Sequence, residues 1–152
     1  MQLRIGNKQD EPACRDLAKK CAGDGGFNFD LETADADLRN IELAFIGHDG
    51  VFIVVEENEA VIAFAAARKG ENEDVCSLRY LCVHESARRR GLGRKLVEQI
   101  LFFARNLEYK VLRTDFRTPD KSNTRPDAAE FFSRVGFHPS GAGKYEMVAA
   151  VS

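Results

Sequence analysis

The middle of the chain carries the clearest alternation between apolar and polar segments. Residues 51–55 form a continuous apolar run, and residues 60–67 form a second one after a short polar turn at 56–59. Two apolar runs joined by so short a turn predict a β-hairpin. After the acidic loop 70–74, residues 76–83 predict a third strand of the same group.

Helical segments flank this group of strands. Apolar residues at the spacing of one helix face, together with residues that favour helix starts, predict helices over about 11–21, 30–46, 92–105 and 126–135. Short apolar segments predict further strands at 3–5, 110–116 and 145–151, with an extra strand after Gly136. The order of elements, β-α-α-β-β-β-α-β-α-β, indicates an α/β domain with a mixed sheet.

Length and composition fit one folded domain over residues 1–152, because no repeat or linker divides the chain. With 44% hydrophobic and 30% charged residues, the composition is typical of a soluble globular protein. No apolar run approaches the roughly 20 residues of a membrane span, so we expect no membrane association. The N-terminus also lacks the apolar segment of a secretory signal.

Cysteines and histidines give no sign of disulfide or metal chemistry. Neither set has the spacing of a disulfide framework or a metal site: Cys14, Cys21, Cys76 and Cys82, and His48, His84 and His138. Cys14 and Cys21 are placed to share one helix face, where cysteines commonly pack as small apolar residues. We therefore expect no metal and a reducing, cytoplasmic setting.

Positive charge is concentrated in one place. Residues 88–95 hold five positive charges and no negative one, so the rest of the net −2 chain carries 17 basic against 24 acidic residues, a net charge of −7. One basic spot without interleaved aromatic residues argues against nucleic-acid binding. The spot coincides with the predicted start of helix 92–105, where unpaired N–H groups, glycines and arginines together suit a diphosphate.

The phosphate-binding interpretation has an alternative and two exclusions. A solvated basic loop at a helix start explains the same residues. The G-x-x-x-x-G-K-[ST] motif of P-loop nucleotidases is absent, and Leu96 stands where a dinucleotide-binding G-x-G-x-x-G motif needs its third glycine.

Two motifs resemble those of the GNAT acetyltransferase superfamily. The L-x-V sequence at 81–83 and the R-x-x-G-x-G sequence at 88–93 are similar to the family's motif that follows its fourth strand. Residues 128–137, which end in Gly-Phe, are similar to its A-x-x-x-Y-x-x-x-G-F segment. The resemblance covers nearly the whole chain. It implies the acyl-CoA N-acyltransferase fold, with a mixed, mostly antiparallel sheet of about six or seven strands and about four helices.

This resemblance also implies an N-acetyltransferase that uses acetyl-CoA and an amine acceptor, on a small molecule or a protein. In the family, the fourth strand splays from the fifth and the pantetheine arm lies in the gap. The implied cofactor-binding residues are Leu81, Cys82, Val83, Arg88, Arg89, Arg90, Gly91, Leu92, Gly93, Arg94, Asn123 and Phe132. One backbone N–H near Leu81 or Cys82 would stabilise the oxyanion of the thioester carbonyl. Family members often dimerise through strand edges, which leaves a homodimer open.

The chain departs from the family pattern at the positions that move protons. Phe132 stands where many members have a tyrosine acid, and the acidic residue of the fourth strand is missing. Tyr80, His84 and Tyr145 are the candidates to replace them, although each also has an ordinary packing or loop role. The alternative hypothesis is therefore a catalytically impaired module that binds acyl-CoA and regulates.

Overall fold

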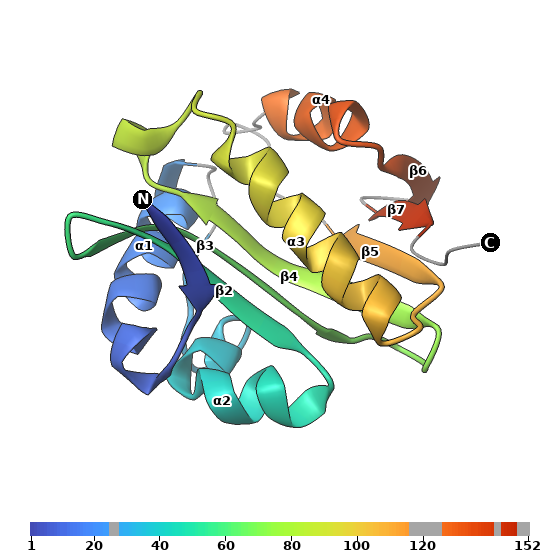
Figure 1. Ribbon diagram of the computed structural model, residues 1–152, viewed down its shortest axis with the longest axis horizontal. Helices are drawn as coiled ribbons and strands as arrows, with labels where there is room; N and C mark the ends of the chain where they lie inside the picture. The colour runs from blue at the N-terminus through green and yellow to red at the C-terminus, as the bar shows by residue number, and fades with distance from the viewer. Residues whose placement is uncertain (25–27, 116–125, 142–143, 149–152) are drawn as a thin grey trace.

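A computed structural model describes residues 1–24, 28–115, 126–141 and 144–148. In this part of the chain, seven strands form one sheet in the order β1-β2-β3-β4-β5-β7-β6 (Figure 1). The strands are β1 (Gln2–Ile5), β2 (Val51–Glu57), β3 (Ala60–Lys69), β4 (Val75–Val83), β5 (Val111–Asp115), β6 (His138–Gly141) and β7 (Lys144–Val148). All neighbours are antiparallel except β4 and β5, which are parallel. The expected mixed, mostly antiparallel sheet is confirmed, including the extra strand after Gly136.

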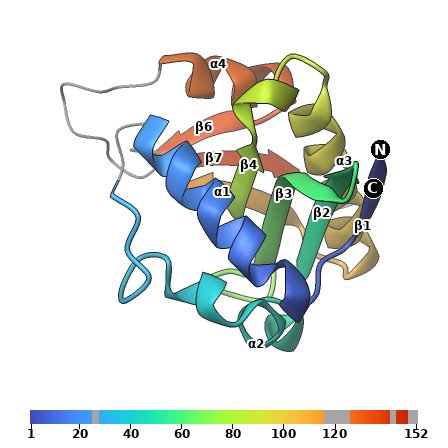
Figure 2. The same ribbon diagram turned by 90° about the vertical axis from the view of Figure 1, so that its left-hand side faces the viewer.

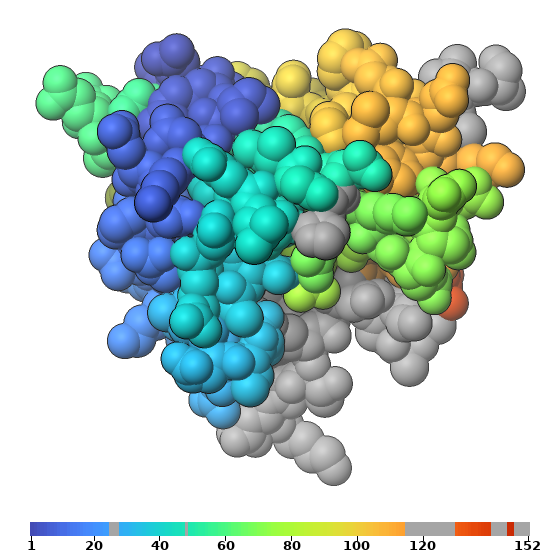
Figure 3. Space-filling view, turned by 90° about the horizontal axis from the view of Figure 1, so that it is seen from below, coloured from blue at the N-terminus to red at the C-terminus, as the bar shows by residue number. Residues whose placement is uncertain are grey.

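Helices cover both faces of the sheet. The four α-helices of the described residues are α1 (Glu11–Asp24), α2 (Ile41–Ala44), α3 (Leu92–Asn106) and α4 (Pro126–Arg134). Helices α1 and α2 lie on one face and α3 lies on the other (Figures 1 and 2). From below, the segments from α1 to β2 form one continuous part of the surface, coloured blue to cyan (Figure 3).

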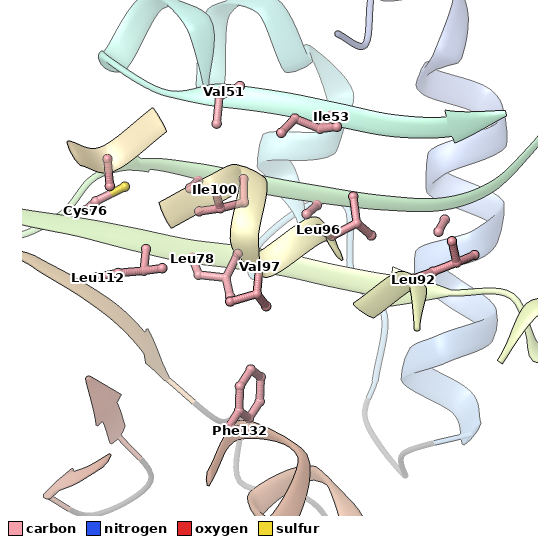
Figure 4. Packing of buried hydrophobic residues seen from close by; sticks show 14 of the residues in the cluster. Val51, Ile53, Cys76, Leu78, Leu92, Leu96, Val97, Ile100, Leu112 and Phe132 are labelled. Atoms are coloured by element: carbon pink, nitrogen blue, oxygen red, sulfur yellow. The ribbon is translucent and has the colours of Figure 1, made fainter. Parts of the chain in front are cut away.

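The side chains of β2 alternate between two hydrophobic cores, as strand geometry requires. Val51, Ile53 and Val55 pack toward α3, whereas Phe52 and Val54 pack toward α1 and α2. On the α3 side, the helix inserts its predicted apolar face, including Leu96, Val97 and Ile100, against the sheet (Figure 4). The continuous apolar run in the sequence therefore reflects a strand that is buried on both faces.

The prediction of one helix over 30–46 is wrong. This segment contains only short pieces: a 3-10 turn at Ala36–Arg39, the four-residue α2 and another 3-10 turn at Ile46–His48. Asn40 is extended, with φ −152° and ψ 91°, and its side chain accepts a hydrogen bond from the N–H of Leu43 at 3.1 Å. A residue that caps a helix in this way starts a new helix and interrupts the periodicity that the sequence displays.

Candidate active site

Strands β4 and β5 separate partway along their length. Their pairing ends with Leu78 opposite Thr114, although β4 continues through residues 79–83. At this point the Thr114 hydroxyl donates to the Leu78 carbonyl oxygen at 3.3 Å. Within the described residues, the end of β4 therefore has one edge paired with β3 and no partner strand from β5.

A β-bulge in β4 lies at the point of separation. Residues Ala66 and Ala67 of β3 pair with Tyr80 and Leu78, which leaves Arg79 as an extra residue in β4. Leu78 packs in the core under α3, whereas Tyr80 packs in the core under α1. A bulge redirects the side chains of a strand, so this single extra residue places Tyr80 on the α1 face of the sheet, opposite to Leu78.

The register of β4 with β3 identifies which main-chain groups face the open edge. The N–H of His84 donates to the carbonyl of Ile62 at 2.8 Å, and hydrogen-bonded pairs alternate along an antiparallel ladder. Tyr80 and Cys82 are therefore the residues that bond β3, whereas Leu81 and Val83 direct their N–H and C=O groups to the opposite edge. Of the two residues predicted to offer an oxyanion N–H, only Leu81 has it on the open side.

The loop after β4 leads into an uncapped helix start. Arg89 and Gly91 both have positive φ, 65° and 77°, and Gly91 is the N-cap of α3 with no side-chain hydrogen bond. The first N–H that bonds back within this helix turn is that of Lys95, to the Gly91 carbonyl at 3.1 Å. The N–H groups before it point out of the helix start, and backbone of this kind forms a concave site for anions.

Several arginines of the basic spot are already engaged. Arg88 donates from Nε to the Val83 carbonyl at 3.2 Å and pairs with Asp24 at 3.3 Å. Arg90 donates to Glu57 of the β2–β3 hairpin at 3.1 Å. Among the described residues, Arg89, Arg94 and Lys95 have no ion-pair partner, and Arg94 donates to the Arg134 carbonyl at 3.4 Å. Two of the five charges are therefore paired with acidic residues that the sequence analysis did not select, Asp24 and Glu57.

Helix α4 brings two phenylalanines beside the start of α3. A Cβ atom on Gly93 would lie 3.0 Å from the ring of Phe131, so this glycine allows α3 and α4 to approach closely. Phe132 is buried, and its ring centroid lies 5.3 Å from those of Phe131 and Phe137. Phe132 therefore lies in the hydrophobic core, and its contact with a cofactor stays a prediction.

The hydroxyl of Tyr80 is hydrogen-bonded to a buried carboxyl group. The hydroxyl donates to Oδ1 of Asp35 at 2.6 Å, and the N–H of Asp30 donates to Oδ2 of the same group at 2.8 Å. Asp35 is completely buried. The sequence did not single out Asp35, because its partner comes from a strand 45 residues away.

The other predicted residues have different surroundings. The Nδ1 atom of His84 accepts from the N–H of Ser86 at 3.1 Å, which caps the short helical turn after β4. Tyr145 lies in β7 opposite Thr114, next to the point where β4 and β5 separate. Asn123 lies outside the described residues.

Replacing Tyr80 with phenylalanine is expected to lower the free energy of unfolding by about 1–3 kcal/mol, because a completely buried carboxyl oxygen of Asp35 loses a hydrogen-bond donor. Tyr109→Phe is the matched control, since its buried hydroxyl donates to the neutral carbonyl of Asp49 at 2.9 Å; its loss is expected to be about 1 kcal/mol. Urea unfolding of both variants measures the difference. Equal losses would show that Asp35 does not depend on Tyr80.

Two further findings concern the described residues as a whole. No helix among them is long and apolar enough to cross a membrane. They also contain no group of three or more histidine, cysteine, aspartate or glutamate residues arranged to hold a metal ion.

Comparisons with known proteins agree on one fold. A family model described as "Acetyltransferase (GNAT) domain" matches residues 48–139. No curated protein matches the chain in sequence. A GNAT-family acetyltransferase from Staphylococcus aureus Mu50 is similar in structure, with TM-score 0.81, 15% identity and coverage of 97% of this chain and 98% of that one. A phosphinothricin acetyltransferase from Sinorhizobium meliloti, solved in complex with AcCoA, has TM-score 0.75, 16% identity and coverage of 97% and 87%.

Proposed function

This chain belongs to the GNAT acetyltransferase family, and on that premise we propose that it binds acetyl-CoA between β4 and β5 and transfers the acetyl group to an amine. One observation carries the proposal. The pairing of β4 with β5 ends at Leu78 and Thr114, while β4 continues to Val83 and leads into the uncapped start of α3. Within the described residues, this arrangement joins an edge of β4 that no strand pairs with to an anion site.

The free edge and the helix start match two adjacent parts of acetyl-CoA, the pantetheine arm and the diphosphate. Leu81 offers its N–H and C=O groups, and Val83 offers its N–H, to the amides of the pantetheine arm, as an added strand would. The Val83 carbonyl already accepts from Arg88 and Cys21. The N–H groups after Gly91, with the charge of the helix N-terminus, offer donors to the diphosphate. The crystallisation of the similar Sinorhizobium meliloti acetyltransferase with AcCoA supports this choice of ligand.

Acetyl transfer requires few catalytic groups from the protein. The neutral amine nitrogen forms a bond to the thioester carbonyl carbon, and the carbon–sulfur bond breaks to give the N-acetyl amine and CoA. Leu81 would donate its N–H to the carbonyl oxygen as negative charge develops there. A thiol with a pKa near 8.5 leaves readily as the thiolate. The proton released by the amine can then reach this thiolate through Tyr80, His84, Tyr145 or water.

Charge supports a cationic acceptor. Outside residues 88–95 the chain has a net charge of −7, and a field of this sign attracts amines and lysine side chains. Two arginines near the bulge only partly offset this negative charge, because Arg68 and Arg79 both pair with Asp37, at 3.3 Å each.

Acetyl-CoA is expected to raise the melting temperature of the protein and to bind with a 1:1 stoichiometry in calorimetry, because a ligand of the folded state stabilises it. Chromatographic measurement of CoA and acetylated product across a panel of polyamines, aminoglycosides and lysine peptides then tests for transfer. Binding with no product from any amine would favour the regulatory module. No thermal shift at millimolar acetyl-CoA would contradict the proposal.

A further inference from the structure

Two cysteines meet where the last turn of α1 crosses the end of β4. Figure 2 shows α1 lying across β3 and β4. The Cys21 thiol donates to the carbonyl oxygen of Val83, the residue after Cys82, at 3.7 Å, and Cys21 packs against the core that contains Cys82. Cys82 is 6% exposed in the core under α1, whereas Cys21 is only partly buried at the edge of that core. An outer thiol therefore lies beside an inner one.

Charged groups lie around Cys21 and favour its thiolate. The neighbouring Cys82 thiol, opposed by burial and assisted by the positive charge of Arg88, lowers the pKa of Cys21 to about 7. Arg88 reaches the same Val83 carbonyl as Cys21, at 3.2 Å, and pairs with Asp24 at 3.3 Å. Lys20, which directly precedes Cys21 in α1, pairs with Glu85 at 3.2 Å.

The other two cysteines provide the contrast within the same chain. Burial raises the pKa of Cys14 and of Cys76 to about 12, and both side chains are completely buried. Cys14 lies two turns before Cys21 on the same helix. The thiolate is the reactive form of cysteine. Cys21 is therefore both more accessible and more readily ionised than Cys14 and Cys76.

We propose that Cys21 and Cys82 form a thiol–disulfide exchange site for low-molecular-weight disulfides. The Cys21 thiolate attacks one sulfur of the disulfide RSSR, its S–S bond breaks, and one RS⁻ leaves and takes up a proton. Cys82 then loses its proton and attacks the Cys21 sulfur, which releases the second RSH and leaves a Cys21–Cys82 disulfide. The protein loses two electrons and two protons, and RSSR is reduced to two RSH.

This site is independent of acetyl transfer, because neither step uses acetyl-CoA or an amine. Its position does connect it with the cofactor site. Cys82 belongs to β4 and Cys21 contacts Val83, whose main chain faces the open edge. A disulfide here fixes the last turn of α1 to the strand that we propose binds pantetheine.

Oxidised glutathione is the probe that tests the proposal on the full chain. Intact-mass analysis is expected to show a product lighter by two hydrogens, with release of two glutathione molecules, and peptide mapping is expected to join Cys21 to Cys82. Cys82→Ala should stop at a glutathione adduct on Cys21, and Cys21→Ser should not react. Cys14→Ser is the matched control on the same helix and should behave as wild type.

Limited alkylation of the wild-type protein by iodoacetamide tests the site without any variant. Labelling of Cys21 ahead of Cys14 and Cys76 at neutral pH supports the proposal. Equal labelling of all four cysteines would overturn it. A glutathione adduct that persists on Cys21 in the wild type would also overturn it, because Cys82 would then not act as the resolving thiol.

Discussion

Replacing Gly91 with valine is expected to weaken acetyl-CoA binding about 100-fold or more while leaving the protein folded. Gly91 has φ +77°, and a Cβ atom there would meet nothing within 4 Å. The cost is therefore conformational: a left-handed residue other than glycine loses about 1–2 kcal/mol, and a branched side chain loses more. The loop relieves this strain by moving, and two charge-assisted hydrogen bonds to the diphosphate, at about 1.5–3 kcal/mol each, account for the loss of affinity.

Calorimetric titration with acetyl-CoA measures the effect, and Gly23→Val supplies the control. Gly23 also has open space around a built Cβ atom but no left-handed φ, and it lies in α1. Its valine variant should bind acetyl-CoA as wild type does. Gly93 is less suitable for this test, because a side chain there would also press on Phe131 and disturb the packing of α4. Unchanged affinity of the Gly91→Val variant would show that the start of α3 does not bind acetyl-CoA.

Replacing Leu81 with proline is expected to lower kcat for acetyl transfer about 100- to 1,000-fold, which is the usual effect of removing one oxyanion donor. Proline has no N–H, and the N–H of Leu81 faces the open edge rather than β3. The substitution therefore deletes a group that we assign to the reaction without breaking the β3–β4 ladder. Acetyl transfer to the best amine of the panel gives kcat, and calorimetry gives the affinity for acetyl-CoA.

Two variants separate the main-chain effect from other causes. Leu81→Ala keeps the N–H and removes most of the side chain, so its kcat should stay within about tenfold of wild type. Cys82→Pro removes an N–H that bonds β3 and is expected to unfold the protein. If Leu81→Ala lost as much activity as Leu81→Pro, the side chain rather than the N–H would be responsible.

Local patterns predicted most of the fold, because the burial of a strand and the apolar face of a helix both depend on residues that are close together in sequence. The β2–β3 hairpin, the apolar face of α3 and the strand after Gly136 all follow from such patterns. The segment 30–46 failed because apolar spacing does not reveal that Asn40 starts a new helix with its side chain. The Asn40 side chain replaces a backbone hydrogen bond within a single turn, which leaves the spacing of the apolar residues around it unchanged.

The candidate site was predictable in position and less so in detail. The glycines and arginines after β4 marked the helix start, and the register then separated Leu81 from Cys82. The bulge at Arg79 has no local signal, since an extra residue in a strand depends on its partner. Asp35 and Cys21 were missed for the same reason: their contacts, with Tyr80 and with Val83, join residues far apart in sequence.

Amide hydrogen exchange followed by NMR tests whether acetyl-CoA binds at the open edge of β4, because it reports on single N–H groups along this strand. Acetyl-CoA is expected to slow exchange at Leu81 and Val83 and at the first residues of α3. Tyr80 and Cys82, which bond β3, should exchange slowly with and without the ligand and serve as internal controls. Protection that appears elsewhere, or unchanged exchange at Leu81 and Val83 under saturating acetyl-CoA, would contradict binding between β4 and β5.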